Sequence, residues 1–209
     1  MVISKQTQKI IDTINSELVK LDSLSLEEKI EALNLLKEKL KEHSPFSDPV
    51  DIVKWVPSEL VIANEYNPNR VAPPEMKLLE ISIREDGFTQ PIVVFSENGH
   101  YTVVDGFHRN RVGKESQEIK KRIHNHLPVV IIDKPLSDRM AATIRHNRAR
   151  GTHQVAPMSK VVEELYFLGW SDKKIAEQLG MEKDEVLRLK QFTGLGNLFK
   201  NREFSKAWE

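Results

Sequence analysis

Hydrophobic residues recur at helical spacing through the first forty residues of the chain. A first stripe contains Ile10, Ile14, Leu18 and Leu21, and a second contains Ile30, Leu33, Leu36 and Leu40. Ser25-Leu26-Glu27-Glu28 lies between them and is a capping box, which marks the start of a helix. The pattern therefore predicts a helical hairpin between residues 4 and 43, which packs on its own domain or on a partner. The segment Ser44–Pro49 predicts a linker.

From residue 50 to 136 the pattern changes to short apolar runs that are typical of strands. These runs occupy residues 52–56, 91–95, 101–104 and 129–132. Asn98-Gly99 predicts a tight hairpin between the second and third runs. Between the first two, Pro73-Pro74 and Gly87 predict the start and the end of a helix. We expect a small α+β domain here.

Beyond Pro135 the chain is predicted to be wholly helical. Glycines separate segments near residues 137–149, 159–169, 172–180, 183–193 and 195–208. Ala176 and Gly180 are placed where the two helices of a helix-turn-helix cross closely and turn. The predicted fold class is α+β, in which a small mixed-sheet domain follows an N-terminal helical hairpin and precedes a helical C-terminal region. The predicted domains are 1–48, 49–136 and 137–209.

Composition narrows the choice of partners and compartment. The 209 residues hold 31 Lys+Arg and 31 Asp+Glu, so the formal net charge is zero and a polycationic DNA coat is excluded. The three predicted domains have charges of −2, −1 and +3. There is no cysteine, which excludes disulfides and thiolate metal sites. No apolar run approaches the roughly 20 residues of a membrane span, and we expect a cytoplasmic protein.

The segment Val103–Arg111 contains the most informative chemistry. A strand enters Gly106, and His108 and Arg109 then open a helix, so backbone N–H groups, the helix dipole and cationic side chains converge on one point. This arrangement predicts a phosphate cradle. In the alternative interpretation, Arg109 and Arg111 pair with nearby carboxylates.

Three more blocks strengthen the first interpretation: residues 67–70, 82–92 and 146–150. In this order the four blocks resemble the ParB/sulfiredoxin superfamily, with a ParB-like N-terminal domain followed by a helix-turn-helix, over about residues 50–193. The motifs YNPN, DGFTQP, DGFHRNR and NRARGTHQ most resemble those of the IbrB-like members. These members are described as co-activators of prophage-borne gene expression, and they are often encoded beside a phosphoadenosine-phosphosulfate-reductase-like (PAPS-reductase-like) protein.

The resemblance implies a nucleotide ligand, CTP or ATP/ADP, with Mg²⁺. The implied ligand-binding residues are Thr89, Gln90, Gly106, His108, Arg109, Arg111, Asn147, Arg148 and Arg150, and Asn147 is also the candidate metal ligand. Phe107 stands where segregation ParB proteins have the glutamate tied to nucleotide hydrolysis. The reactive cysteine of sulfiredoxins is absent from the same motif, which excludes sulfinic acid reduction.

Asp105 allows an enzymatic alternative. A carboxylate beside a phosphate cradle can bind Mg²⁺ or accept a proton from an attacking hydroxyl. Asp105, Gly106, His108 and Arg109 are similar to the motif of a nucleotide-dependent free serine kinase in the superfamily. A phosphotransferase or nucleotidase would use Asp105 as the base, together with His108. Asp before Gly is also ordinary turn chemistry.

The second helix of the predicted helix-turn-helix begins with acidic residues, Glu182, Asp184 and Glu185, which would repel DNA. The candidate DNA contacts are Lys173, Lys174, Lys183, Arg188 and Lys190. The leading interpretation is a nucleotide-binding regulator linked to DNA, a transcriptional co-activator. Alternatives are the phosphotransferase and a DNA-free partner of a PAPS-reductase-like protein. A homodimer is also compatible with the pattern.

Overall fold

The computed structural model describes residues 3–63, 73–148 and 155–192. Contacts divide the chain into two compact units, Met1–Trp55 and Val56–Glu209. The fold class is α+β, as predicted. Over the described residues, none of the helices combines the length and apolar character that a membrane span requires.

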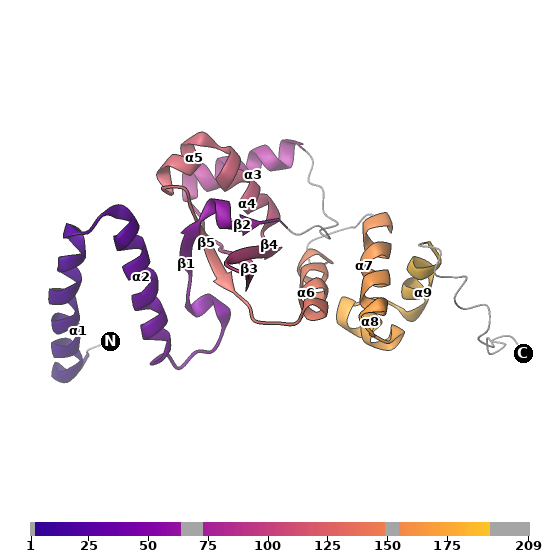
Figure 1. Ribbon diagram of the computed structural model, residues 1–209, viewed down its shortest axis with the longest axis horizontal. Helices are drawn as coiled ribbons and strands as arrows, with labels where there is room; N and C mark the ends of the chain where they lie inside the picture. Colours follow the sequence, from indigo (N-terminus) through magenta and orange to yellow (C-terminus); the bar gives the residue numbers. More distant parts are fainter. Residues whose placement is uncertain (1–2, 64–72, 149–154, 193–209) are drawn as a thin grey trace, which may run out of the picture. The chain divides into compact units, whose positions relative to one another are not determined.

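The first unit is built around a helical hairpin, which confirms the prediction for residues 4–43 (Figure 1). Its elements are α1 (Lys5–Leu18), the 3-10 helix η1 (Val19–Ser23), α2 (Leu26–Lys41) and the 3-10 helix η2 (Pro49–Asp51). The hydroxyl of Ser4 caps α1 by accepting from the Thr7 N–H. Ser25 and Glu28 form the predicted capping box of α2.

One side of α2 is bound to the segment that leads out of this unit. The Asn34 amide donates to the Trp55 carbonyl at 2.7 Å and accepts from the Trp55 N–H at 3.0 Å. The Lys37 ammonium donates to the Val53 carbonyl at 2.8 Å. These bonds hold residues 53–55 along α2, whereas neither α1 nor α2 contains a buried residue.

The second unit contains a five-stranded mixed sheet in the order β1-β5-β3-β4-β2. Its strands are β1 (Lys54–Pro57), β2 (Val61–Ile62), β3 (Ile92–Glu97), β4 (His100–Asp105) and β5 (His126–Ile131). β3 pairs antiparallel with β4 and parallel with β5, and β2 pairs parallel with β4. Asn98 and Gly99 have positive φ angles of 51° and 78°, which confirms the predicted hairpin turn.

The two-residue strand β2 was not predicted because it is too short to show an alternating pattern. The 3-10 helix η3 (Ser58–Leu60) precedes it. The Lys114 ammonium donates to the Val61 carbonyl of β2. This edge strand therefore depends on a side chain 53 residues away in the sequence.

Three helices of the second unit lie near one another (Figure 1). They are α3 (Pro73–Asp86), α4 (Phe107–Glu115) and the short α5 (Gln117–Arg122), of which α5 was not predicted. α4 packs closely on the core at Gly113, where an added Cβ would lie 2.5 Å from Leu127 Cδ2. A side chain at this position would therefore have to displace Leu127, which is fully buried, so glycine favours this close packing of α4.

The helical region contains α6 (Leu136–Arg148), α7 (Val155–Phe167), α8 (Asp172–Leu179) and α9 (Lys183–Phe192). Gly180 ends α8 in a left-handed conformation, and Ala176 is buried beside it, which confirms the predicted helix-turn-helix. Apolar residues of α6 to α9 share one core with Trp170. The helix predicted at residues 195–208 lies outside the described residues.

A buried cation joins α9 to α8. Lys190 is fully buried, its ammonium donates to the Asp172 carboxylate at 2.6 Å, and it lies 3.7 Å from the centre of the Tyr166 ring. A buried ion pair is stable only if its hydrogen bonds and contacts compensate for the hydration that the charges lose on burial. Lys190 therefore holds the helix-turn-helix together.

We expect Asp172→Ala to lower the free energy of unfolding by about 3 kcal/mol, because the buried Lys190 ammonium loses its carboxylate. Lys190→Met should cost less, since the remaining Asp172 side chain is 43% exposed to water. Urea denaturation measures both. Glu177→Ala, which removes an exposed partner of Lys173, is the control and should change stability by less than about 1 kcal/mol. A larger loss for Lys190→Met than for Asp172→Ala would contradict this assignment.

Candidate anion-binding site

The N-terminus of α4 is the centre of the candidate site. Gly106 precedes the helix with φ +90° and ψ 25°, a left-handed conformation that side chains other than glycine rarely adopt. No side chain caps this end of the helix. The first-turn N–H groups of a helix lack intrahelical acceptors and carry partial positive charge, so they favour an anion.

The β3–β4 pairing brings a second segment to this point. Val93 lies opposite Asp105, so the residues that enter β3 are beside those that leave β4. The Arg109 guanidinium uses this proximity: Nη1 donates to Gln90 Oε1 at 2.7 Å, and Nη2 donates to the Pro91 carbonyl at 3.3 Å. Gln90 was predicted as a ligand-binding residue, whereas its contact with Arg109 was not predicted.

Asp105 lies beneath Arg109. Its side chain is 6% exposed, and Oδ2 accepts from Arg109 Nη2 at 3.4 Å. A Cβ added at Gly106 would approach Arg109 Nη2 to 3.0 Å and the Ile92 Cα to 3.3 Å. The glycine therefore both turns the chain and leaves space for the guanidinium, which Asp105 and Gln90 hold in one orientation.

His108 lies in the first turn of α4 and is half-buried. Burial is the largest cause that lowers the pKa of its imidazole below the ordinary value. The positive charges of Arg111 and Arg109 lower this pKa further, and the carboxylates of Asp105 and Glu75 oppose them. A neutral His108 can donate one hydrogen bond to an anion and can gain a proton when negative charge arrives.

Arg111, one turn further along α4, is held differently. Its Nε donates to both carboxylate oxygens of Glu115, at 2.9 and 3.0 Å, and its side chain is 54% exposed. It also lines a pocket of about 430 Å³ between α3 and α4, together with Met76 and Lys77. The alternative in which the arginines of this motif pair with nearby carboxylates therefore holds for both, since Arg109 pairs with Asp105 and Arg111 with Glu115. The exposed Arg111–Glu115 pair is weak enough to exchange for a ligand.

The remaining predicted ligand-binding residues are described only in part. Thr89 is exposed next to Gln90. Asn147 and Arg148 belong to the last turn of α6, and Arg150 follows it. The side chains of Asn147 and Arg148 and the whole of Arg150 lie outside the described residues, so their roles stay predictions.

Two arginines of α6 have structural contacts that were not predicted. The Arg139 side chain is buried, with its guanidinium 3.5 Å from the centre of the Phe95 ring of β3. Arg145 donates to the backbone carbonyl and the side-chain oxygen of Gln178 in α8. α6 therefore contacts both the sheet and the helix-turn-helix. Because these two arginines are used in such contacts, the number of basic residues in this region overestimates the positive charge that a ligand can reach.

A metal ion has little support within the described residues. Over residues 3–63, 73–148 and 155–192, His, Asp and Glu side chains form no group of three that could hold a metal ion. Asp105, the nearest carboxylate to the cradle in the motif, is engaged with Arg109. The described side chains do not fit a protein-held Mg²⁺ site, and the metal role of Asn147 stays a prediction.

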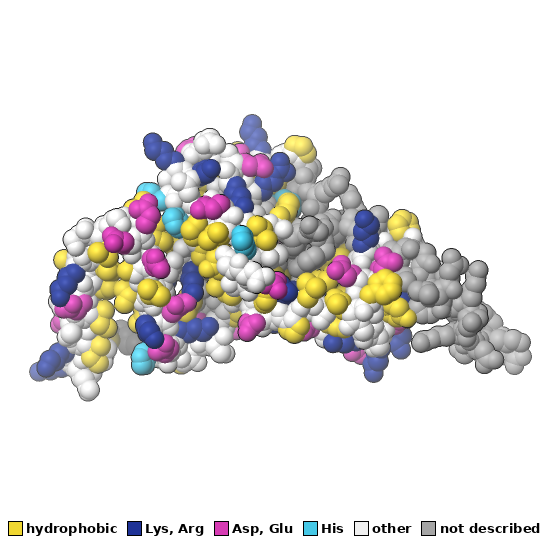
Figure 2. Space-filling view, in the orientation of Figure 1, with side chains coloured by type: hydrophobic (Ala, Val, Ile, Leu, Met, Phe, Trp, Pro, Cys, Tyr) yellow, Lys and Arg dark blue, Asp and Glu magenta, His cyan; other side chains and the backbone are white. Residues whose placement is uncertain are grey.

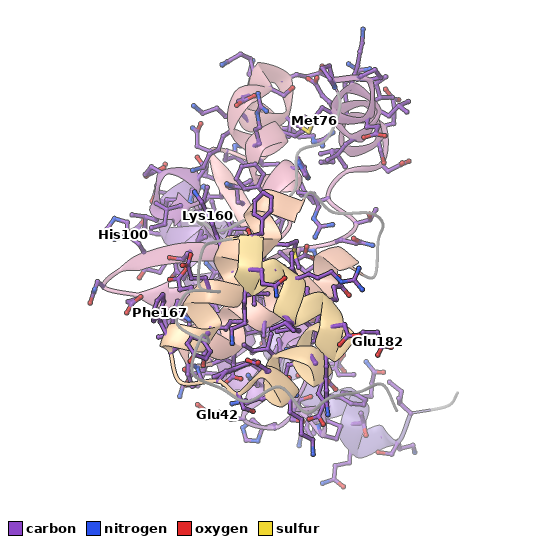
Figure 3. All side chains as sticks on the ribbon, turned by 90° about the vertical axis from the view of Figure 1, so that its right-hand side faces the viewer. Glu42, Met76, His100, Lys160, Phe167 and Glu182 are labelled. Carbon is purple, nitrogen blue, oxygen red and sulfur yellow. The ribbon has the colours of Figure 1, made fainter. Side chains whose placement is uncertain are left out.

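The helix-turn-helix presents four of its five predicted DNA contacts at the surface: Lys173, Lys174, Lys183 and Arg188 are exposed. The prediction for Lys190 was wrong, because its ammonium is fully buried against Asp172 and Tyr166. Glu182 is exposed next to the start of α9 (Figure 3). The acidic start of this helix is thus a surface feature, as predicted.

Comparison with known proteins gives two family matches. The family described as ParB N-terminal domain matches residues 42–148, and the family described as IbrB-like C-terminal HTH domain matches residues 153–201. The uncharacterized protein YbdM of Escherichia coli (strain K12) is 51% identical over 190 residues, which cover 90% of this chain and 91% of YbdM.

Three solved structures are also similar, at low identity. The C-terminally truncated chromosome-partitioning protein ParB from Caulobacter crescentus complexed with CTP-gamma-S is 19% identical over 72% of this chain and 88% of that chain, with a TM-score of 0.40. Its complex with the centromeric parS site is 18% identical over 70% and 76%, with a TM-score of 0.46. A Pnob8-like ParB-N domain is 12% identical over 72% and 74%, with a TM-score of 0.48.

The lowered pKa of His108 predicts a pH dependence of stability. When folding lowers the pKa of a basic group, the folded state has its full stability above the group's ordinary pKa, here near 6.5. This stability is lost as the pH falls toward the pKa of the folded state, because the unfolded state then binds the proton more readily. Urea denaturation at pH 7.5 and 5.5 should therefore show a larger loss for the wild type than for His108→Gln. The difference is at most about 1.4 kcal/mol per pH unit, and less because the ring is half-exposed.

Inorganic pyrophosphate provides the control for this measurement. A bound anion favours the protonated imidazole, so pyrophosphate should reduce the difference between the wild type and His108→Gln at pH 5.5. Equal pH dependence of the two proteins would contradict the lowered pKa.

Proposed function

We infer that this chain, which belongs to the ParB N-terminal domain family and carries an IbrB-like helix-turn-helix domain, is a DNA-linked regulator controlled by a nucleotide. The phosphate groups of CTP, ATP or ADP would bind at the N-terminus of α4. The proposed output is transcriptional co-activation.

The observation that carries the proposal is the orientation of Arg109 over an uncapped helix N-terminus. Its guanidinium is held by Gln90, Pro91 and Asp105 before any ligand arrives, so binding need not pay for ordering a long side chain. The backbone N–H groups after Gly106 and the neutral His108 supply further donors. Such a set of donors suits the oxygens of a phosphate group.

DNA binding is supported by the exposed cations of the helix-turn-helix. Lys173 and Lys174 lie in the first turn of α8, and Arg188 lies in the second half of α9. Because Glu182 and Asp184 are exposed at the start of α9, we propose that the helix is tipped so that Arg188 approaches the phosphate backbone. Contacts of this kind confer affinity more than sequence specificity.

The phosphotransferase alternative has less support. A general base needs access to the proton that it removes, and the Asp105 side chain is 6% exposed and paired with Arg109. This contact favours a positioning role, in which Asp105 orients the guanidinium. If Asp105 is instead a base, Asp105→Asn will abolish phosphoryl transfer while nucleotide binding persists.

Nucleotide binding is tested by thermal shift and calorimetry of the full chain with CTP, ATP and ADP, with and without Mg²⁺. A ligand that binds the folded state raises Tm by mass action. We expect Arg109→Ala to weaken binding by about tenfold or more, because a hydrogen bond to a charged group contributes roughly 1.5–3 kcal/mol.

Arg84→Ala, which removes a partly exposed arginine of α3 paired with Glu85, is the matched control and should bind as the wild type does. Arg109→Lys separates charge from geometry, since lysine retains the charge without the planar fork. Equal affinity of wild type and Arg109→Ala for every nucleotide would refute the cradle.

DNA binding is tested by the salt dependence of duplex affinity. Arg188→Ala should weaken binding to all duplexes and reduce the slope of log K against log salt by about one phosphate contact. Lys20→Ala, on η1, is the control and should leave the slope unchanged. If duplex affinity does not change in Arg188→Ala, the proposed DNA contact through α9 is rejected. A change in duplex affinity when nucleotide is added would support coupling between the DNA site and the nucleotide site.

A further inference from the structure

The candidate anion-binding site consists mainly of hydrogen-bond donors. The first-turn N–H groups of α4 and the Arg109 guanidinium can donate to an anion, whereas the carboxylate of Asp105 is engaged with Arg109. Figure 2 shows Lys and Arg side chains interspersed with Asp and Glu side chains over α3 to α5. Attraction by this mixed surface does not distinguish one oxyanion from another, so selection among oxyanions depends on the groups that touch the ligand.

Asn110 is a buried polar residue near the start of α4. It is 4% exposed, and among the described residues its side-chain oxygen Oδ1 has no hydrogen-bond partner. Its backbone N–H, in contrast, donates to the Gly106 carbonyl at 2.9 Å. A buried carbonyl oxygen without a partner lowers stability, and most such groups in proteins are satisfied. The packing of the core therefore does not account for an amide at this position.

Helix geometry directs the Asn110 amide toward the end of α4 where the anion would bind. Side chains of an α-helix tilt toward its N-terminus, so each one covers the turn before its own Cα. For Asn110 this turn begins at Gly106, the residue that precedes the helix. Arg109 reaches the same turn, since a Cβ added at Gly106 would lie 3.0 Å from Arg109 Nη2. Asn110 and Arg109 therefore serve the same helix end.

An acceptor among these donors favours an anion that carries a proton. The amide oxygen can accept a hydrogen bond from a P–OH group, whereas it repels an ionised oxygen, which is itself only an acceptor. Phosphate monoesters lose their second proton at about pH 6, and inorganic phosphate keeps at least one proton at neutral pH. Sulfate has the same tetrahedral shape but is fully ionised. A buried polar group that the wrong ligand leaves unpaired is an effective means of discrimination.

We propose that Asn110 is a specificity-determining residue of the candidate anion-binding site. Its Oδ1 accepts a hydrogen bond from an O–H of the bound anion, so the site selects a protonated phosphate over a fully ionised oxyanion such as sulfate. This role rests on the proposed function, because it requires an anion at the N-terminus of α4. It narrows the ligand class to phosphate groups that retain a proton, as a fraction of terminal nucleotide phosphates do near neutral pH.

Titration of the full chain with inorganic phosphate and with sulfate, at equal ionic strength, tests this role. The rise in Tm gives the Kd of each anion by mass action, and Arg109→Ala supplies the background of non-specific stabilisation. We expect the wild type to bind phosphate at least about threefold more tightly than sulfate, because one hydrogen bond accounts for a difference of this size. Asn110→Leu, which has a similar shape but no acceptor, should abolish the preference.

The stability of the unliganded protein provides a second measurement. Asn110→Leu should raise Tm by about 2–4 °C, because it removes a buried carbonyl that lacks a partner. Asn34→Leu is the matched control: both ends of the Asn34 amide are bonded to the Trp55 backbone, so the same substitution should lower Tm and leave the phosphate preference unchanged. Asn110→Ala removes the same acceptor without adding atoms, and it reports the preference if leucine does not fit.

The outcomes separate this role from the proposed function. Equal affinity of the wild type for phosphate and sulfate, or a phosphate preference that survives in both Asn110 variants, would overturn the role of Asn110 while the anion-binding site stands. A lower Tm of Asn110→Leu together with an unchanged preference would identify a structural amide. If neither anion raises the Tm of the wild type more than that of Arg109→Ala, both the role of Asn110 and the proposed phosphate site fail.

Discussion

The antiparallel pairing of β3 and β4 is the constraint on which the second unit depends. It places the entrance of β3 beside the exit of β4, so Pro91 and Asp105 both accept hydrogen bonds from the Arg109 guanidinium although they belong to different strand ends. Gly106 then turns the chain into α4 at this same point, and Gly113 allows α4 to lie directly against Leu127. The helix N-terminus is therefore positioned by the sheet and not by its own loop.

This geometry determines the electrostatics of the candidate site. Asp105 balances part of the charge of Arg109, and the half-buried His108 is kept toward its neutral form by burial and by two arginines. Arg109 and the uncapped N-terminus of α4 give the candidate site positive charge, and the guanidinium is already oriented. Preorganised donors of this kind favour binding because little reorganisation is needed when the ligand arrives.

Several cations of the chain stabilise the fold and are not available to ligands. Arg139 packs on Phe95 and connects α6 to β3, and Lys190 pairs with Asp172 and connects α9 to α8. Arginine and lysine can serve this purpose because their long side chains cover apolar surface while the charge finds an aromatic ring or a carboxylate. The density of positive charge in the sequence is therefore a poor measure of the charge presented to DNA or to a nucleotide.

Much of the fold follows from neighbouring residues alone. The capping box at Ser25, the turn at Asn98-Gly99 and the left-handed end of α8 at Gly180 each depend on a few adjacent side chains, and so the α+β order and the helix-turn-helix were predicted correctly. The strand, glycine and helix that form the cradle were likewise visible in the sequence.

Only the tertiary structure decided which side chains meet. Gln90 accepts from Arg109 across 19 residues, β2 pairs with β4, and Lys190 is buried although its residue type favours the surface. These contacts join segments that are distant in sequence, so no local pattern records them. The sequence by itself determined the elements and the chemistry available at α4. The pairing of the strands determined the orientation of that chemistry, because only the sheet register places Gln90 and Asp105 on either side of one guanidinium.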